Sequence, residues 1–223
     1  MTLRLYAIID AKPTYSLGRG IAGAPLALVR VAGAWAVVEP TEEVPAAPTI
    51  PSLLAHDRVV RRIARPAAKS GPFVSAVLPL RFGSTVDDRA GLSKLLAPLA
   101  EPIAVALDRV RGAVQFTLRV TGQPTPPPKL PRSAGPGTRF LTARVLARRV
   151  PEIDPLTEAT RPFVRELRVE RHERPPLLAS VYHLVAREDV RRWRAVTRRT
   201  LDDLDVQVTT SGPWPAYAFA ELE

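Results

Sequence analysis

The stretch from Phe73 to Asp88 constrains the fold most, because it joins an apolar run to residues that end a strand and form a turn. Phe73–Leu80 is apolar almost throughout, which is typical of a strand that is covered on both faces. Pro79 cannot donate to a sheet ladder, so we expect it at the end of this strand or on a sheet edge. Gly83 follows and is expected to form the turn. We expect the partner of this stretch at the other end of the chain, in Ser211–Phe219.

The first half of the chain predicts alternating strands and helices. Thr2–Ile9 has the two-residue period of a strand, with Leu3, Leu5, Ala7 and Ile9 on one face, and Val114–Thr121 alternates apolar and polar residues. Between them we expect a hairpin, a helix from Ser52 to Pro66, the strand at Phe73–Leu80 and a helical segment over Asp88–Arg111. This order is close to a ferredoxin-like split βαβ layout. We therefore predict a first domain over residues 1–121.

Two details of the predicted helices can be compared directly with a structure. Leu53, His56, Val60 and Ile63 recur at spacings of three and four, which predicts the buried stripe of the first helix. A lone histidine on such a stripe is more often a hydrogen-bonded core residue than a ligand. In the second segment Pro98 and Pro102 cannot lie inside one straight helix, so we expect a break near residues 98–101.

The second half predicts a separate α+β domain behind a stiff linker. Residues 122–137 are rich in proline and form the clearest linker. Residues 138–223 are predicted to contain three helices and three strands. The helices are expected over Thr138–Val150, Ile153–Glu170 and Arg187–Asp203, and the strands over Leu177–Val185, Val206–Thr210 and Tyr217–Leu222. The fold class is α+β.

The net charge of +10 leaves two interpretations of the basic residues open. A basic chain can bind nucleic acid. However, 28 of the 32 basic residues are arginine and the chain is also rich in alanine and proline, a combination that GC-rich codons produce. The charge forms no long tail of one sign. Cysteine is absent, which excludes disulfides and thiolate metal sites and fits an intracellular protein.

Two stretches resemble functional segments but are better explained by local structure. Gly18, Gly20 and Gly23 have the spacing of a dinucleotide-binding fingerprint, but Pro25 and an extended segment follow where a helix would have to begin. We interpret these glycines as a loop. Gly20–Val38 is apolar enough to suggest a membrane helix, but its glycines, its proline and Arg30 favour two strands around a tight turn.

The sequence contains little chemistry that would support catalysis. None of the three histidines has metal-ligand spacing to another histidine or to an acidic pair. No nucleophile elbow or phosphate-binding loop is present. We therefore expect no catalytic, cofactor-binding or metal-binding residues, and a scaffold or interaction protein rather than an enzyme. A basic nucleic-acid-binding protein is the alternative.

Several segments along the chain resemble the GvpL/GvpF family of gas vesicle proteins. The most specific are the Pro-x-Arg-Phe-Gly run at 79–83 and the closing Gly-Pro-Trp-Pro-Ala-Tyr-Ala-Phe at 212–219. Weaker support comes from Leu5–Ile9, the helix around His56, Phe116–Val120, the segment 135–141 and Val181–Val185. The resemblance covers nearly the whole chain. It does not distinguish the F-type from the L-type member.

The resemblance implies an accessory protein that is needed to assemble gas vesicles in the cytoplasm. It implies contact with the small hydrophobic shell protein GvpA and with other accessory proteins, and no cofactor. It also implies a modified ferredoxin-like domain followed by an α+β domain. An exposed apolar patch could cover the shell protein. We hypothesise that Arg81 and Phe82 lie near such a surface, with Trp214 and Tyr217 as the alternative contact.

Overall fold

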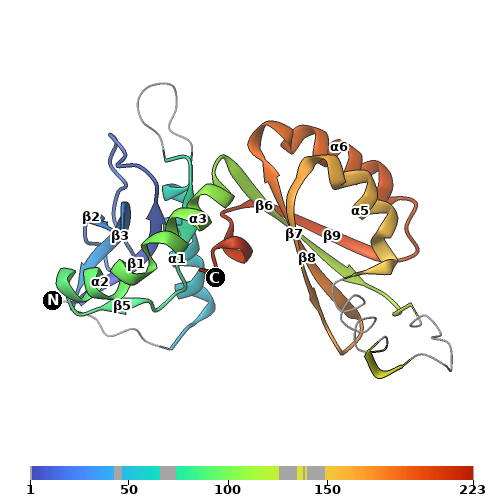
Figure 1. The fold of residues 1–223 in the computed structure, drawn as a ribbon, viewed down its shortest axis with the longest axis horizontal. Helices are drawn as coiled ribbons and strands as arrows, with labels where there is room; N and C mark the ends of the chain where they lie inside the picture. The colour runs from blue at the N-terminus through green and yellow to red at the C-terminus, as the bar shows by residue number, and fades with distance from the viewer. Residues whose placement is uncertain are drawn as a thin grey trace. The chain divides into compact units, whose positions relative to one another are not determined.

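The computed structural model describes residues 2–42, 47–65, 74–125, 135–137, 139 and 149–222. The chain divides into two compact units (Figure 1). The first unit comprises Met1–Ala113 together with Trp214–Glu223, and the second comprises Val114–Pro213. Each unit contains its own sheet and helices, so the predicted α+β class is confirmed.

The first unit is built on a sheet with the strand order β2-β3-β1-β4, and a further strand, β5, pairs with β1. The strands are β1 (Thr2–Ile9), β2 (Ala27–Val31), β3 (Ala34–Thr41), β4 (Val77–Pro79) and β5 (Thr85–Val86). β1 is central and is buried at every position after its first residue. β2 and β3 form the predicted hairpin, and Ala32 and Gly33 both have positive φ in its turn.

The first unit contains three helices, and capping residues and prolines set several of their ends. They are α1 (Ile50–Ile63), α2 (Arg89–Leu96) and α3 (Ala100–Val110). α1 begins at a capping box in which Thr49 is the N-cap and Ser52 the third helical residue, so Ser52 lies inside the helix. A short 3₁₀ turn, η1 (Ala97–Leu99), separates α2 from α3, which confirms the predicted break.

The apolar run after α1 forms a shorter strand than predicted. Phe73 lies outside the described residues, and β4 covers only Val77–Pro79. Pro79 is its last residue, and β4 ends the strand order, as the missing N–H of proline requires. Gly83 has φ +85°, which confirms the predicted glycine turn. A closing 3₁₀ turn, η5 (Tyr217–Phe219), lies against β4 and α3, so β4 meets the closing segment of the chain as expected.

One stretch of the first unit has the length and composition of a membrane span. Arg89–Val110 has a mean hydropathy of 1.4 in its most apolar window, of which 28% is buried. The helices of a soluble core meet the same criteria. Here η1 interrupts the run, and Leu92, Ile103 and Leu107 are buried in the first unit. The run is thus two helices that each bury one face in the core, while most of its apolar window is not buried.

The second unit contains a four-stranded sheet with the order β7-β8-β6-β9. Its strands are β6 (Ala113–Thr121), β7 (Val164–Arg171), β8 (Leu177–Ala186) and β9 (Gln207–Trp214). The helices α5 (Asp154–Thr160) and α6 (Val190–Leu201) lie side by side on the sheet (Figure 1). Three 3₁₀ turns flank these helices, η2 (Pro151–Ile153), η3 (Arg161–Phe163) and η4 (Arg187–Asp189).

Two secondary-structure predictions for this region are wrong. The second half of the helix predicted over Ile153–Glu170 is the strand β7, because η3 at Pro162 ends the helix and β7 pairs with β8. The closing segment also differs, since β9 continues through Gly212 and Pro213 where a break was predicted. The strand predicted over Tyr217–Leu222 contains η5 instead. The helix predicted over Thr138–Val150 lies almost wholly outside the described residues.

The compact units also differ from the predicted domain boundaries. β6 was expected to complete the first sheet, but its neighbours are β8 and β9 of the second. Its apolar side chains Phe116, Leu118 and Val120 belong to the second hydrophobic core. The last ten residues return to the first unit instead of completing the second. Most of the predicted linker, residues 126–134, lies outside the described residues.

A buried tryptophan organises the core of the second unit. Trp193 of α6 is 1% exposed and stacks on Phe116 of β6, with ring centroids 4.1 Å apart. Its indole Nε1 donates to Nδ1 of His183 on β8 at 3.1 Å. His183 is fully buried, and its Nε2 has no hydrogen-bond partner among the described residues. Its burial lowers the pKa of His183 to about 4.

We expect this histidine to make the second unit sensitive to acid. In the unfolded chain a histidine titrates near pH 6.5, so between pH 6.5 and about 4 the unfolded state binds a proton that the folded state does not. The contribution of neutral, buried His183 to the stability of the second unit is fully present above pH 6.5 and is lost as the pH falls towards 4. Stability should drop by about 3 kcal/mol across this window and level off below it. Urea denaturation at a series of pH values, monitored through the hydrogen exchange of β8 amides, measures this drop.

The control for this prediction is His183→Gln, because a glutamine oxygen can still accept from Trp193 but does not titrate. The variant should lose most of the slope between pH 6.5 and 4. An unchanged slope would assign the acid sensitivity to other groups.

Candidate functional site

The N-terminal half of α1 presents large apolar side chains to solvent. Ile50 is 75% exposed, Leu53 43% and Leu54 48%. Residues separated by three or four positions share one helix face, so these three form a continuous strip. The buried residues of α1, which are His56, Val59, Val60 and Ile63, occupy a different face. The prediction that His56 belongs to the buried stripe is confirmed, whereas the prediction for Leu53 is wrong.

The predicted site residues Trp214 and Tyr217 extend this strip along the same helix. The Tyr217 hydroxyl donates to Oδ1 of Asp57 at 3.0 Å. Oδ2 of Asp57 accepts from Nε of Arg61 at 2.6 Å, and the Arg61 guanidinium lies 3.9 Å from the centre of the Trp214 ring. Asp57 and Arg61 continue the spacing of Ile50, Leu53 and Leu54 by one and two turns. We call Ile50, Leu53, Leu54, Trp214 and Tyr217 the α1 surface.

The hydrogen bond of Tyr217 to Asp57 fixes the aromatic end of the α1 surface. Burial and the adjacent Asp57 carboxylate raise the pKa of Tyr217, so its hydroxyl stays protonated and donates. Tyr217 remains 36% exposed. The ring is therefore held in place by a polar bond while part of its apolar surface stays accessible.

The other two predicted site residues, Arg81 and Phe82, follow β4. The Phe82 ring meets the His56 ring of α1 edge-on, with centroids 5.8 Å apart. Nε2 of His56 lies 3.0 Å from the Leu80 carbonyl oxygen and donates to it. Burial lowers the pKa of His56, which keeps the ring neutral. Phe82 is thus half-buried against the inner side of α1, while Arg81 beside it is exposed.

The structure therefore gathers three of the four predicted residues around one helix. Phe82 contacts α1 through His56, Tyr217 through Asp57 and Trp214 through Arg61. Sequence reasoning missed the three exposed residues Ile50, Leu53 and Leu54. The signal that could have found them is their spacing of three and four, which coincides with a second helix face that is apolar but distinct from the buried stripe.

A buried polar network beneath α1 was also missed from the sequence. Glu39 of β3 is fully buried, and its Oε2 accepts from the Tyr6 hydroxyl at 2.6 Å and from Nη1 of Arg4 at 3.3 Å. Its Oε1 accepts from the Ala24 amide at 3.1 Å. Burial and then the bond to Glu39 raise the pKa of Tyr6 to about 12. The Tyr6 ring stacks on His56 at 5.1 Å and so links this network to α1.

The glycine-rich loop packs on this network. A Cβ at Gly20 would lie 2.2 Å from the Glu39 side chain, so only glycine fits there. The Ile21 amide donates to the Tyr6 hydroxyl at 2.8 Å. The residues that follow, Ala27–Val31, form β2 and not a helix, which confirms the loop interpretation of the three glycines. Gly20 thus serves the close approach of backbone to a buried carboxylate.

The polar groups of the first unit that are described above support the packing of the sheet and of α1. Across the residues that the structure describes, no three histidine or acidic side chains lie close enough together to hold a metal ion. The first unit instead presents the exposed apolar α1 surface, whose side chains are held by a helix and by the hydrogen-bonded Tyr217.

Comparisons with known proteins identify relatives of the whole chain. A family model described as gas vesicle synthesis protein GvpL/GvpF matches residues 3–221. The crystal structure of the gas vesicle protein GvpF from Anabaena sp. PCC7120 is similar, with a TM-score of 0.77 and 14% identity over 100% of this chain and 97% of that one. GvpF from Microcystis aeruginosa gives a TM-score of 0.75 and 14% identity over 99% of both chains. No curated protein sequence matches the chain.

Proposed function

This chain belongs to the GvpL/GvpF family of gas vesicle synthesis proteins, and from that premise we propose that it assists assembly by binding the hydrophobic shell protein GvpA through the α1 surface. Membership supports a role in gas vesicle assembly and an association with the vesicle. The finer part of the proposal, the shell protein and the surface that holds it, rests on the chemistry of α1.

The exposed apolar strip of α1 is the observation that carries the proposal. A helix that packs on a sheet normally places its leucines inward, but Leu53 and Leu54 are 43% and 48% exposed. Contiguous exposed apolar surface on a protein marks an interaction site. A strongly apolar subunit that would aggregate alone is the occupant that such a surface suits. The aromatic side chains Trp214 and Tyr217 are of the type that dominates binding energy at interfaces.

In this proposal Arg81 and Phe82 lie at the border of the surface that contacts GvpA. Phe82 supports α1 from its inner side through His56, and Arg81 is exposed nearby. Mutation of Phe82 would therefore act by shifting α1, whereas mutation of Tyr217 or Leu54 would remove direct contact. The same surface could also receive the other accessory proteins that the family resemblance implies.

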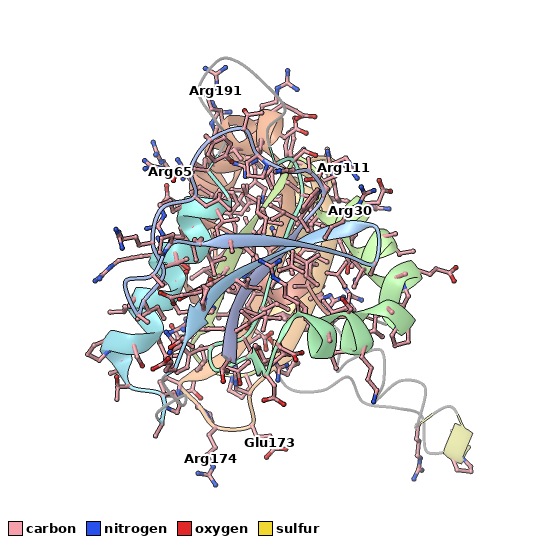
Figure 2. The ribbon with its side chains drawn as sticks, turned by 90° about the vertical axis from the view of Figure 1, so that its left-hand side faces the viewer. Arg30, Arg65, Arg111, Glu173, Arg174 and Arg191 are labelled. Atoms are coloured by element: carbon pink, nitrogen blue, oxygen red, sulfur yellow. The ribbon has the colours of Figure 1, made fainter. Side chains whose placement is uncertain are left out.

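The nucleic-acid alternative is supported by one group of exposed arginines on α6, Arg191, Arg192, Arg194, Arg198 and Arg199, whereas the other arginines are dispersed. In the first unit Figure 2 shows Arg65 on the side opposite Arg30 and Arg111, and in the second unit it shows Arg174 and Arg191 at opposite ends. Several other arginines are paired with carboxylates, among them Arg4, Arg61, Arg149 and Arg171. A nucleic-acid interface needs its cations gathered on one face. DNA binding that falls steeply with salt would restore this alternative.

Substitution of one exposed leucine tests the proposal in a binding experiment. We expect Leu54→Glu to weaken capture of GvpA by the immobilised chain by about tenfold or more, because it places a charge in the centre of the apolar contact. The measurement is a pull-down with purified GvpA over a concentration series. Circular dichroism melts establish that each variant is folded.

Leu95→Glu is the matched control for this experiment. Leu95 is also a helical leucine and is 54% exposed, but it lies on α2, outside the α1 surface. Its variant should bind GvpA as the unmodified chain does. Equal losses in both variants, or no loss in Leu54→Glu, would contradict the assignment of the α1 surface.

A further inference from the structure

The second unit contains a pocket that the proposed function does not use. Its volume is about 320 Å³, within the range of small-molecule sites. It lies between one face of α6, the β6 residue Phe116 and the β9 segment 210–212. The α6 residues that line it are Trp193, Arg194, Thr197, Arg198 and Leu201. Their spacing of three and four explains why they share one face of the helix.

Two arginines give this pocket a positive wall. The Arg194 guanidinium lies 5.5 Å from the centre of the Phe116 ring, and its Nη2 donates to the Gly212 carbonyl at 3.4 Å. These contacts hold the head group in the pocket wall. Arg198 follows one turn later. Neither arginine forms an ion pair with a carboxylate in the part of the chain that the structure describes, so their charge is available to a ligand.

A buried hydroxyl in the same wall also has no partner. Thr197 is 3% exposed, and its Oγ1 makes no hydrogen bond with any described residue. This hydroxyl is shielded from the pocket, so a ligand there meets Thr197 only through its other atoms. The hydroxyl lies on α6 between the two arginines in sequence, and Phe116, Trp193 and Leu201 provide apolar surface beside it.

We propose that this pocket binds a small organic anion whose phosphate or carboxylate group is held by Arg194 and Arg198. The planar guanidinium pairs with either oxyanion through two parallel hydrogen bonds. The apolar part of the ligand rests against Phe116 and Leu201. This site is independent of the α1 surface, because all of its residues belong to the second unit.

Calorimetric titration of the full chain tests this site. The probes are phenyl phosphate and benzoate, with benzyl alcohol as the neutral probe of the same shape. We expect both anions to bind at a single site per chain and benzyl alcohol not to bind. The tighter of the two anions identifies the preferred oxyanion group. Thr197→Val, which keeps the shape of the side chain but removes its hydroxyl, should leave anion binding nearly unchanged, because that hydroxyl is shielded from the pocket.

Charge variants on α6 separate a built site from general attraction. Arg198→Gln should weaken anion binding by about tenfold or more. Arg191→Gln and Arg199→Gln remove the same charge from exposed positions of the same helix that do not line the pocket, and should leave binding nearly unchanged. Equal weakening by all three, equal binding of benzyl alcohol, or no anion binding at millimolar concentration would overturn the proposal.

Discussion

Replacing Glu39 with alanine is expected to lower the free energy of unfolding of the first unit by about 3–5 kcal/mol. The carboxylate is fully buried and accepts from Tyr6, Arg4 and the Ala24 amide. Its removal breaks the buried ion pair with Arg4, a residue that is 7% exposed, and leaves a void beside Gly20. Hydrogen exchange of the β1 and β3 amides in urea measures the loss, because these strands carry the network.

The control for this variant is Glu42→Ala, which removes a carboxylate of the same kind three residues later. Glu42 is exposed, and its replacement should change stability by less than about 0.5 kcal/mol. Similar losses in the two variants would show that the buried network contributes little to the fold. Because Tyr6 stacks on His56, the loss in Glu39→Ala should also increase exchange in α1.

Replacing Trp193 with alanine is expected to destabilise the second unit by about 3–5 kcal/mol. The indole is 1% exposed, stacks on Phe116 at 4.1 Å and donates to His183 at 3.1 Å. Its removal leaves a large cavity and deprives a fully buried histidine of its hydrogen-bond donor. The urea dependence of amide exchange in β6 and β8 measures the change.

Trp193→Phe divides this effect into packing and hydrogen bonding. A phenyl ring retains most of the contact with Phe116 but cannot donate to His183, so we expect a smaller loss of about 1–3 kcal/mol. The amides of β1 should keep their protection in both variants, because β1 belongs to the other unit. A loss in Trp193→Ala as small as that of a surface substitution would contradict the central place of this residue in the core.

The sequence predicts well those features that depend on local chemistry. Pro79 ends β4 because it lacks an N–H, and η1 separates α2 from α3 because of the prolines near it. Gly83 forms its turn through positive φ. The buried, hydrogen-bonded place of His56 follows from its position on a helical stripe. The family was predicted from several segments along the chain, of which two short motifs are the most specific, and the match over residues 3–221 confirms it.

The features that depend on contacts between distant segments could not be predicted. The alternation of β6 identifies a strand but not the sheet that it joins, and the cores of both units offer apolar partners. Glu39 is buried only because Tyr6, Arg4 and the Gly20 loop converge on it from elsewhere in the chain. For the candidate site, helical spacing suggests two apolar faces on α1, and only the packed structure decides that Leu53 lies on the exposed one.

Restoration of gas vesicles in a host that lacks this gene tests the central claim most directly. The gene is deleted from a host that normally produces vesicles, and each variant is then expressed in the deletion strain. Intact vesicles are counted by electron microscopy. We predict that the unmodified chain and Leu95→Glu restore vesicles and that Leu54→Glu does not, although immunoblots show equal amounts of all three proteins. Normal vesicles after the deletion, or full restoration by Leu54→Glu, would contradict the account.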